Sequence, residues 1–169
     1  MHASNVTLRA ATEADIPTVI ALVRELAEYE RDPEAAVATP DLMREALFGD
    51  RAVAYAVVAE LDGDAVGFAL YFFNFSTWTR RPGLYLEDLY VRPRARGRGI
   101  GLALFKYLAR VAVDRGCGRF ELSVLDWNAD AIGFYERLGG VPMDGWTVYR
   151  FAPDALAAIA TRKGEGDPT

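Results

Sequence analysis

Arg96-Gly97-Arg98-Gly99-Ile100-Gly101 is the stretch that decides the fold of this chain. It follows an apolar run at residues 84–91 that is typical of a strand, and it leads directly into a helical pattern. Its alternating glycines let backbone amides approach a ligand where a Cβ atom would block them. The amides then lie at a helix N-terminus, where unpaired N–H groups and the helix dipole favour an anion. The stretch therefore predicts a site for a pyrophosphate.

Length and composition narrow the class of protein. The 169 residues suit one domain, and a hydrophobic fraction of 51% is enough for a core. A net charge of −5 disfavours nucleic-acid binding, because neutralising phosphates requires a basic face. No apolar run reaches the roughly 20 residues of a membrane span, and we find no secretory signal. Cys117 is the single cysteine, so an intramolecular disulfide is impossible. We expect a cytoplasmic protein without nucleic-acid or membrane partners.

Hydrophobic periodicity and turn residues predict alternating strands and helices. The expected strands are residues 6–10, 53–60, 65–73, 84–91, 119–125 and 146–151, and the expected helices are 16–30, 40–48, 102–115 and 128–138. The order β-α-α-β-β-β-α-β-α-β gives an α/β fold with a mixed, mostly antiparallel central sheet flanked by helices. We expect a single domain over residues 1–169, with a disordered tail from about residue 160.

The position of the glycine loop excludes two common nucleotide sites. A Rossmann domain places its glycine-rich turn after the first strand, whereas this loop follows the fourth. A Walker loop requires Gly-Lys-Ser or Gly-Lys-Thr, which this stretch lacks.

With its strand and helix, the loop resembles the acetyl-CoA-binding motif of the GNAT family of N-acetyltransferases. Further stretches resemble the diamine acetyltransferase branch, which includes spermidine/spermine and thialysine acetyltransferases. They are residues 25–30, 67–69, 85–91, 127–128, 134–139 and 145–146. The similarity covers about residues 6–155. It implies the GNAT fold and direct acetyl transfer from acetyl-CoA to a primary amine, without a metal. By resemblance alone, we also expect a homodimer.

The resemblance assigns residues to acetyl-CoA. In the family, backbone amides of the loop hold the CoA pyrophosphate, which implies this role for Arg96, Gly97, Arg98, Gly99, Ile100 and Gly101. Leu89 and Val91 match positions whose backbone holds the acyl chain. Asn128 matches a CoA-contacting position, but it also suits a helix N-cap.

Two further residues match the catalytic positions of the family. Glu87 matches the glutamate that removes the amine proton, and a carboxylate within one water of an ammonium is a plausible general base. Tyr135 matches the tyrosine that contacts CoA and protonates its sulfur. Asp88 follows Glu87, and regular strand alternation would put the two side chains on opposite faces. We expect both carboxylates to contribute to the substrate site.

The amine is expected to meet carboxylate and aromatic side chains, because both attract an ammonium. Glu30, Trp78 and Trp146 resemble such residues, although Trp146 could equally be a core residue. Polyamine enzymes commonly carry an aspartate two residues before the matching tryptophan, where this chain has Ser76. Arg80 and Arg81 would repel a polycation but could accept an amino-acid carboxylate. The loop therefore favours a small lysine-like or thialysine-like amine slightly over a long polyamine.

Two alternatives remain open from the sequence. One is a CoA-binding regulatory module without catalysis, which would need neither Glu87 nor Tyr135. The other is an acetyltransferase that acts on a protein amine. His2 is expected in a disordered N-terminus and Cys117 to be a small packed residue, and no His, Cys or Asp cluster has metal-ligand spacing.

Overall fold

The computed structural model describes residues 6–162, so the expectations for His2 and for the chain beyond residue 162 lie outside the described residues. Contacts divide the chain into two compact units, Met1–Trp127 and Asn128–Thr169. The first contains β1 (Val6–Ala10), α1 (Ile16–Tyr29), α2 (Pro40–Phe48), β2 (Tyr55–Leu61), β3 (Asp64–Ser76), β4 (Arg81–Val91), α3 (Ile100–Asp114) and β5 (Arg119–Leu122). The second contains α4 (Ala129–Arg137) and α5 (Pro153–Ala160).

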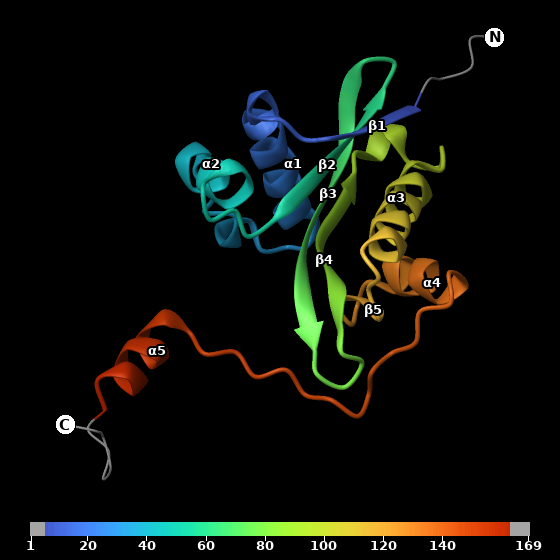
Figure 1. The fold of residues 1–169 in the computed structure, drawn as a ribbon. Helices are drawn as coiled ribbons and strands as arrows, with labels where there is room; N and C mark the ends of the chain where they lie inside the picture. The colour runs from blue at the N-terminus through green and yellow to red at the C-terminus, as the bar shows by residue number, and fades with distance from the viewer. Residues whose placement is uncertain (1–5, 163–169) are drawn as a thin grey trace. The chain divides into compact units, whose positions relative to one another are not determined.

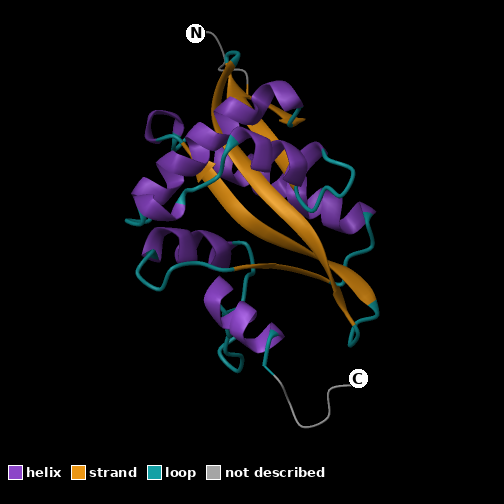
Figure 2. Cartoon of the chain, turned by 90° about the vertical axis from the view of Figure 1, so that its left-hand side faces the viewer, coloured by secondary structure: helices purple, strands orange, loops and turns teal. Residues whose placement is uncertain are grey.

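The first unit is built on a five-stranded sheet in the order β1-β2-β3-β4-β5. The first four strands pair antiparallel, and β5 pairs parallel to β4. Helices α1 and α2 lie on one side of the sheet and α3 on the other (Figure 1). Figure 2 shows the twist of the long strands. The expected α/β fold with a mixed, mostly antiparallel sheet is confirmed.

Each face of the sheet has its own hydrophobic core, because alternate strand residues point to opposite sides. The core under α3 includes Val57, Leu84, Leu86, Ile100, Leu104 and Leu108. The core under α1 and α2 includes Ile16, Val19, Leu22, Val58, Phe68 and Tyr90. Phe68 is fully buried, so the middle of β3 contributes directly to this second core. The two cores together hold β4 and the loop after it in place.

The start of α1 is fixed by a buried carboxylate. Asp15 accepts hydrogen bonds from the Thr12 backbone N–H at 2.7 Å and from its hydroxyl at 2.9 Å. Arg9 donates to both carboxylate oxygens, at 2.7 and 2.8 Å, and also reaches Glu60 on β2. The Arg9 guanidinium and the Thr12 hydrogen bonds hold the pKa of Asp15 well below its usual range. This network joins β1, β2 and α1.

Replacing Asp15 with asparagine is expected to lower the free energy of unfolding by about 2 kcal/mol at pH 7, because Arg9 would lose a charged partner. The pKa of Asp15 is lowered by folding, so its contribution is fully present above the unfolded pKa of about 4 and is lost progressively as pH falls from there toward the much lower folded pKa. Urea unfolding at pH 7 and pH 3 gives the free energy of unfolding of wild type and variant. The difference between the two proteins should be smaller at pH 3 than at pH 7. Asp41→Asn is the control, since Asp41 pairs with Arg44 at an exposed site and should cost less than about 0.5 kcal/mol. An equal cost at pH 7 and pH 3 would contradict this role of Asp15.

The second unit differs from expectation in its last elements. The expected strand at 146–151 is absent from the described residues, and this segment has neither helix nor strand. Its β-branched and aromatic residues favour a strand, but a strand requires a ladder partner, and none is formed here. Instead α5 begins at Pro153, with Asp154 in its first turn. Proline at a first helical position is the same start signal that correctly predicted α2 at Pro40.

Candidate active site

The glycine loop connects β4 to α3 and contains two residues with positive φ. Gly97 has φ +73° and Gly99 has φ +76°, a region that L-residues with a side chain rarely adopt. A Cβ atom built at either position would meet nothing within 4 Å. The loop therefore leaves open space beside its backbone, which is the room that a close ligand approach requires.

Helix α3 begins at Ile100, two residues earlier than expected. Ile100 and Gly101 therefore lie in its first turn, where backbone N–H groups have no intrahelical acceptor. Arg96, by contrast, donates its backbone N–H to Pro93 O at 3.2 Å. The backbone N–H of Arg96 thus has an acceptor within the chain, and the prediction that the loop binds an anion stays a prediction for Arg96 to Gly101.

On the side of β4 that faces away from β3, the end of the strand next to the loop has no neighbouring strand among the described residues. Pairing between β4 and β5 ends at Leu86 and Leu122, whereas β4 continues to Val91. Leu89 and Val91 lie on this continuation, and the Leu89 side chain is 4.0 Å from a Cβ atom built at Gly101. The backbone segment expected to hold the acyl chain thus lies directly beside the start of α3.

A β-bulge interrupts β4 at the expected catalytic glutamate. Leu86 pairs with Tyr71 and Asp88 pairs with Leu70, so Glu87 is an extra residue in the ladder. Regular alternation, on which the sequence-based orientation of Glu87 and Asp88 depended, does not hold here. Bulges re-aim side chains and occur often beside active sites.

Three carboxylates gather near this bulge. Glu87 is exposed and Asp88 is partly buried. Burial, with the nearby charges of Glu87 and then Glu30, raises the pKa of Asp88 to about 6. Burial also raises the pKa of Glu30, which caps the C-terminus of α1. Glu30, far from the adjacent Glu87 and Asp88 in sequence, therefore interacts electrostatically with Asp88 in the folded chain.

Arg96 makes contacts that the sequence did not indicate. Its guanidinium lies 5.0 Å from the ring centroid of Tyr29 and 5.6 Å from that of Tyr90. Its Nε donates to Val91 O at 2.9 Å. Cation–π contacts of this kind favour a fixed guanidinium position. Arg96 thereby links the loop to the end of α1, where Glu30 lies.

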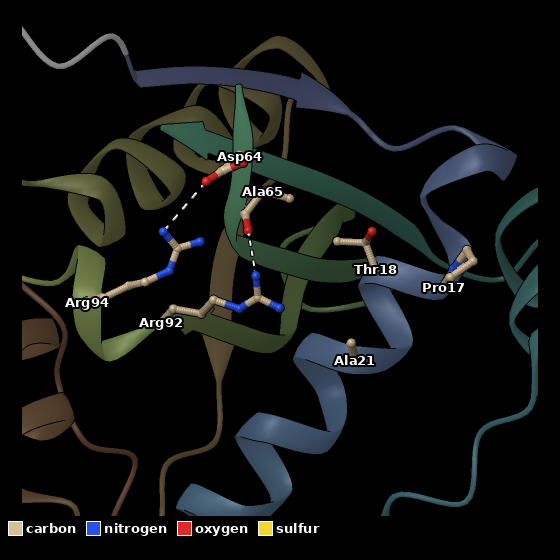
Figure 3. A pocket seen from close by; sticks show the side chains of 7 residues that line it. All are labelled: Pro17, Thr18, Ala21, Asp64, Ala65, Arg92 and Arg94. Carbon is tan, nitrogen blue, oxygen red and sulfur yellow. Dashed lines mark hydrogen bonds and ion pairs between the residues drawn. The ribbon is translucent and has the colours of Figure 1, made fainter. Parts of the chain in front are cut away.

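Arg92 and Arg94 anchor the segment between β4 and the loop. They line a hollow of about 390 Å³ together with Pro17, Thr18, Ala21, Asp64 and Ala65. Arg92 donates to Ala65 O at 2.9 Å and pairs with Glu25 at 2.7 Å, and Arg94 lies 3.7 Å from Asp64. Figure 3 shows both arginines reaching toward the β2–β3 turn. This hollow contains none of the predicted site residues, so we assign its arginines to holding the loop.

Trp78 lies at the opposite end of β4 from Glu87 and Asp88. It is 85% exposed in the turn between β3 and β4. From Arg81 to Glu87 the strand runs six residues, which is roughly 20 Å. Ser76 is buried, and its hydroxyl accepts a hydrogen bond from the Thr79 backbone N–H at 3.3 Å. Ser76 therefore stabilises the turn, and the single chain does not bring Trp78 beside Glu87.

The remaining predicted residues belong to the second unit. Asn128 accepts a hydrogen bond from the Ala131 backbone N–H at 3.2 Å and so caps α4, as expected. Tyr135 lies in α4, with its ring edge-on to that of Phe134 at 5.2 Å between centroids. Trp146 donates its backbone N–H to Met143 O at 3.1 Å, within the segment that has no strand.

Among residues 6–162, no helix is long and apolar enough to cross a membrane. The same residues contain no group of three or more His, Cys, Asp or Glu side chains placed to hold a metal ion.

The chain matches the Acetyltransferase (GNAT) family over residues 19–140. It is 39% identical over 168 residues to thialysine N-epsilon-acetyltransferase of Sus scrofa, covering 93% of this chain and 98% of that protein. It is 34% identical to spermidine/spermine N(1)-acetyltransferase-like protein 1 of Homo sapiens, covering 90% of this chain but 23% of that protein. Among solved structures, the integron cassette protein VCH_CASS6 of V. cholerae has a TM-score of 0.78 and 26% identity, covering 93% and 98% of the two chains.

The family match and the similar relatives agree on the class of protein, a group-transfer enzyme. The chain belongs to the GNAT family, and it is an acetyltransferase.

Proposed function

We propose that this protein transfers the acetyl group of acetyl-CoA directly to a primary amine of a small molecule. The acceptor would be a diamine, a polyamine or a lysine-like or thialysine-like amino acid. One observation carries the proposal: the carboxylates at the β4 bulge lie on the strand that continues into the open glycine loop. This arrangement would place a binder of cationic amines next to a binder of the CoA pyrophosphate.

Acetyl-CoA fits the residues of the loop. The unpaired amides at the start of α3 and the space beside Gly97 and Gly99 would receive the pyrophosphate. The free edge at Leu89 and Val91 would accept the acyl chain, and Asn128 would add a contact beyond its cap role. Bound there, acetyl-CoA would supply the acetyl carbon, and the chemistry left to this chain is to hold the amine and move protons.

The carboxylates would bind the amine as an ammonium and help it lose a proton. Glu30, Glu87 and Asp88 supply the negative charge, and Glu87 would assist deprotonation. Trp78 and Trp146 would offer aromatic faces to the cation. Tyr135 would donate its hydroxyl proton to the departing CoA sulfur.

A small amino acid is the acceptor that we favour. Ser76 stands where polyamine enzymes commonly have an aspartate, and Arg80 and Arg81 follow closely on the same turn. A guanidinium accepts a substrate carboxylate but repels a polycation. The similarity to a thialysine acetyltransferase over nearly its whole length supports the same choice.

We also propose that the two units work as one domain and that the active protein is a homodimer in the cytoplasm. If Trp78 contacts the amine, it must do so in a partner subunit, because about 20 Å of strand separates it from Glu87 in its own chain. Light scattering at working concentration tests the dimer. Trp78→Ala should weaken amine binding without changing the Kd for CoA, and a solely monomeric active protein would contradict the dimer.

The amine panel tests the acceptor. Wild-type protein and acetyl-CoA are mixed in turn with thialysine, lysine, ornithine, spermidine and a peptide with a free N-terminus, and CoA thiol release is followed. We expect the highest kcat/KM with thialysine or lysine. A higher value with spermidine would assign the polyamine role, and a higher value with the peptide would assign a protein acceptor.

A further inference from the structure

The bulge at Glu87 changes the face to which the rest of β4 points its side chains. Before the bulge, Leu84 and Leu86 belong to the core under α3. After the bulge, Leu89 and Val91 lie on that same side. The side chains that face α3 therefore change from even-numbered to odd-numbered residues. Without the extra residue, Asp88 would have continued the even series and pointed toward α3.

Asp88 is therefore on the side of α1 and α2. Two observations agree on this. Tyr90, two residues further on, belongs to the core under α1 and α2. Leu70, the cross-strand partner of Asp88, packs against that same core. Directly paired residues of neighbouring strands share a face, so Asp88 shares the face of Leu70.

This orientation brings Asp88 to the end of α1. Glu30 lies there and is one of the two carboxylates whose charge acts on Asp88. Glu87, the bulged residue, is the other. Asp88 is more buried than Glu87, so its carboxylate is less hydrated. The charges of Glu30 and Glu87 are therefore less screened by water at Asp88.

Several other charged groups near this face have partners. Among them is Arg31, beside Glu30, and its guanidinium lies 4.6 Å from the ring centroid of Trp127. Glu25 on α1 pairs with Arg92 at 2.7 Å. Arg96 lies over Tyr90 and Tyr29, and on β3 the partner of Asp88 is the uncharged Leu70. Within the described part of the chain, the pKa of Asp88 is raised by burial and by the charges of two carboxylates, Glu87 and Glu30. The site around Asp88 therefore suits a cationic group of a substrate.

We propose that Asp88, which the bulge turns to the α1 side of the sheet, accepts the proton of the bound ammonium, and that Glu87 assists from the neighbouring position without taking the proton itself. This inference rests on the proposed acetyl transfer. The proton moves from the ammonium nitrogen to a carboxylate oxygen of Asp88, and the freed lone pair forms the C–N bond as the C–S bond of acetyl-CoA breaks. Tyr135 gives a proton to the sulfur and regains one from solvent. The nitrogen loses a second proton as the amide forms, so one proton is released for each acetyl group transferred.

Asp88 is a better proton acceptor in its environment than an exposed aspartate would be. Its pKa of about 6 is roughly two units above the usual value for aspartate. A base whose pKa is two units higher takes a proton about 100-fold more favourably, yet it stays ionised at pH 7.5 and above. Because the reactive form is the carboxylate, activity should fall as pH decreases below about 6.

The test is the pH profile of kcat/KM for the amine in wild type, Asp88→Asn, Glu87→Gln and Glu30→Gln. Wild type should lose activity on the acid side with a midpoint near pH 6. Asp88→Asn should lower kcat/KM at pH 8 roughly 100-fold and remove this midpoint. Glu87→Gln and Glu30→Gln should keep the midpoint but shift it to lower pH, because each removes a negative charge that raises the pKa of Asp88.

Folding is checked by thermal unfolding at pH 8. The pKa of Asp88 is raised by folding, so its charged form costs stability above that pKa, and Asp88→Asn should have a Tm equal to or above that of wild type. If this variant does not fold, the midpoint shift in Glu30→Gln decides. Three results would overturn the assignment of Asp88. The midpoint of the pH profile would be retained in Asp88→Asn, it would be abolished in Glu87→Gln, or it would be unchanged in Glu30→Gln. Absence of amine-dependent thiol release in wild type would instead reject the proposed function itself.

Discussion

Replacing Gly99 with valine is expected to lower kcat/KM for acetyl-CoA roughly 1,000-fold, because two or more charge-assisted hydrogen bonds would be lost from the loop. Gly99 is the N-cap of α3 and has φ +76°. Valine is disfavoured in this left-handed region, since a left-handed residue with a Cβ atom costs about 1–2 kcal/mol and β-branching adds to it. The loop would move to another conformation, and its amides would no longer converge on one anion.

Gly63→Val provides the matched control for this substitution. Gly63 has φ +90° in the turn between β2 and β3, and a Cβ atom there would meet nothing within 4 Å. The backbone cost is therefore similar, but the position is on a hairpin turn outside the loop. Gly63→Val should lower Tm and leave the Kd for CoA unchanged when it is measured by calorimetry. A Gly99→Val protein that binds CoA as tightly as wild type would contradict the assignment of the loop.

Replacing Tyr135 with phenylalanine is expected to lower kcat roughly 1,000-fold, within the range typical of a lost general acid. The substitution removes one hydroxyl and retains the ring, so its contact with Phe134 should persist. CoA affinity should change little, because the pyrophosphate and the acyl chain are proposed to bind elsewhere, at the loop and on β4. Steady-state thiol release gives kcat, and calorimetry gives the Kd for CoA.

Tyr107→Phe is the control for the loss of a phenolic hydroxyl. Tyr107 packs against the core under α3 and has no proposed role in catalysis. Its variant should keep kcat within about two-fold of wild type, because a single net hydrogen bond of a core residue affects mainly stability. Unchanged thiol release by Tyr135→Phe would remove Tyr135 from the acid role.

Much of this fold could be predicted because its signals are local. Thr12 with Asp15, Pro40, and the Asp62-Gly63 dipeptide each identify an element boundary through a hydrogen bond or a backbone preference of a few residues. The glycine loop is of the same kind: its φ values and its place between strand and helix follow from the sequence around it.

The features that could not be predicted depend on residues far apart in the chain. The bulge at Glu87 follows from pairing with Tyr71 and Leu70, which single-strand alternation cannot reveal. Residues 146–151 have strand-forming side chains, but pairing decides whether a strand forms. Arg96 contacts Tyr29 only after α1 has packed against β4.

Amine-dependent acetyl transfer is tested most directly by a product balance. Wild-type protein, acetyl-CoA and thialysine are incubated, and free CoA thiol and acetylated amine are quantified together by mass spectrometry. We predict equal amounts of the two products, formed at a rate that rises with amine concentration and is lost in Tyr135→Phe. CoA binding without amine-dependent release of thiol, across the whole amine panel, would contradict the account and indicate a binding module.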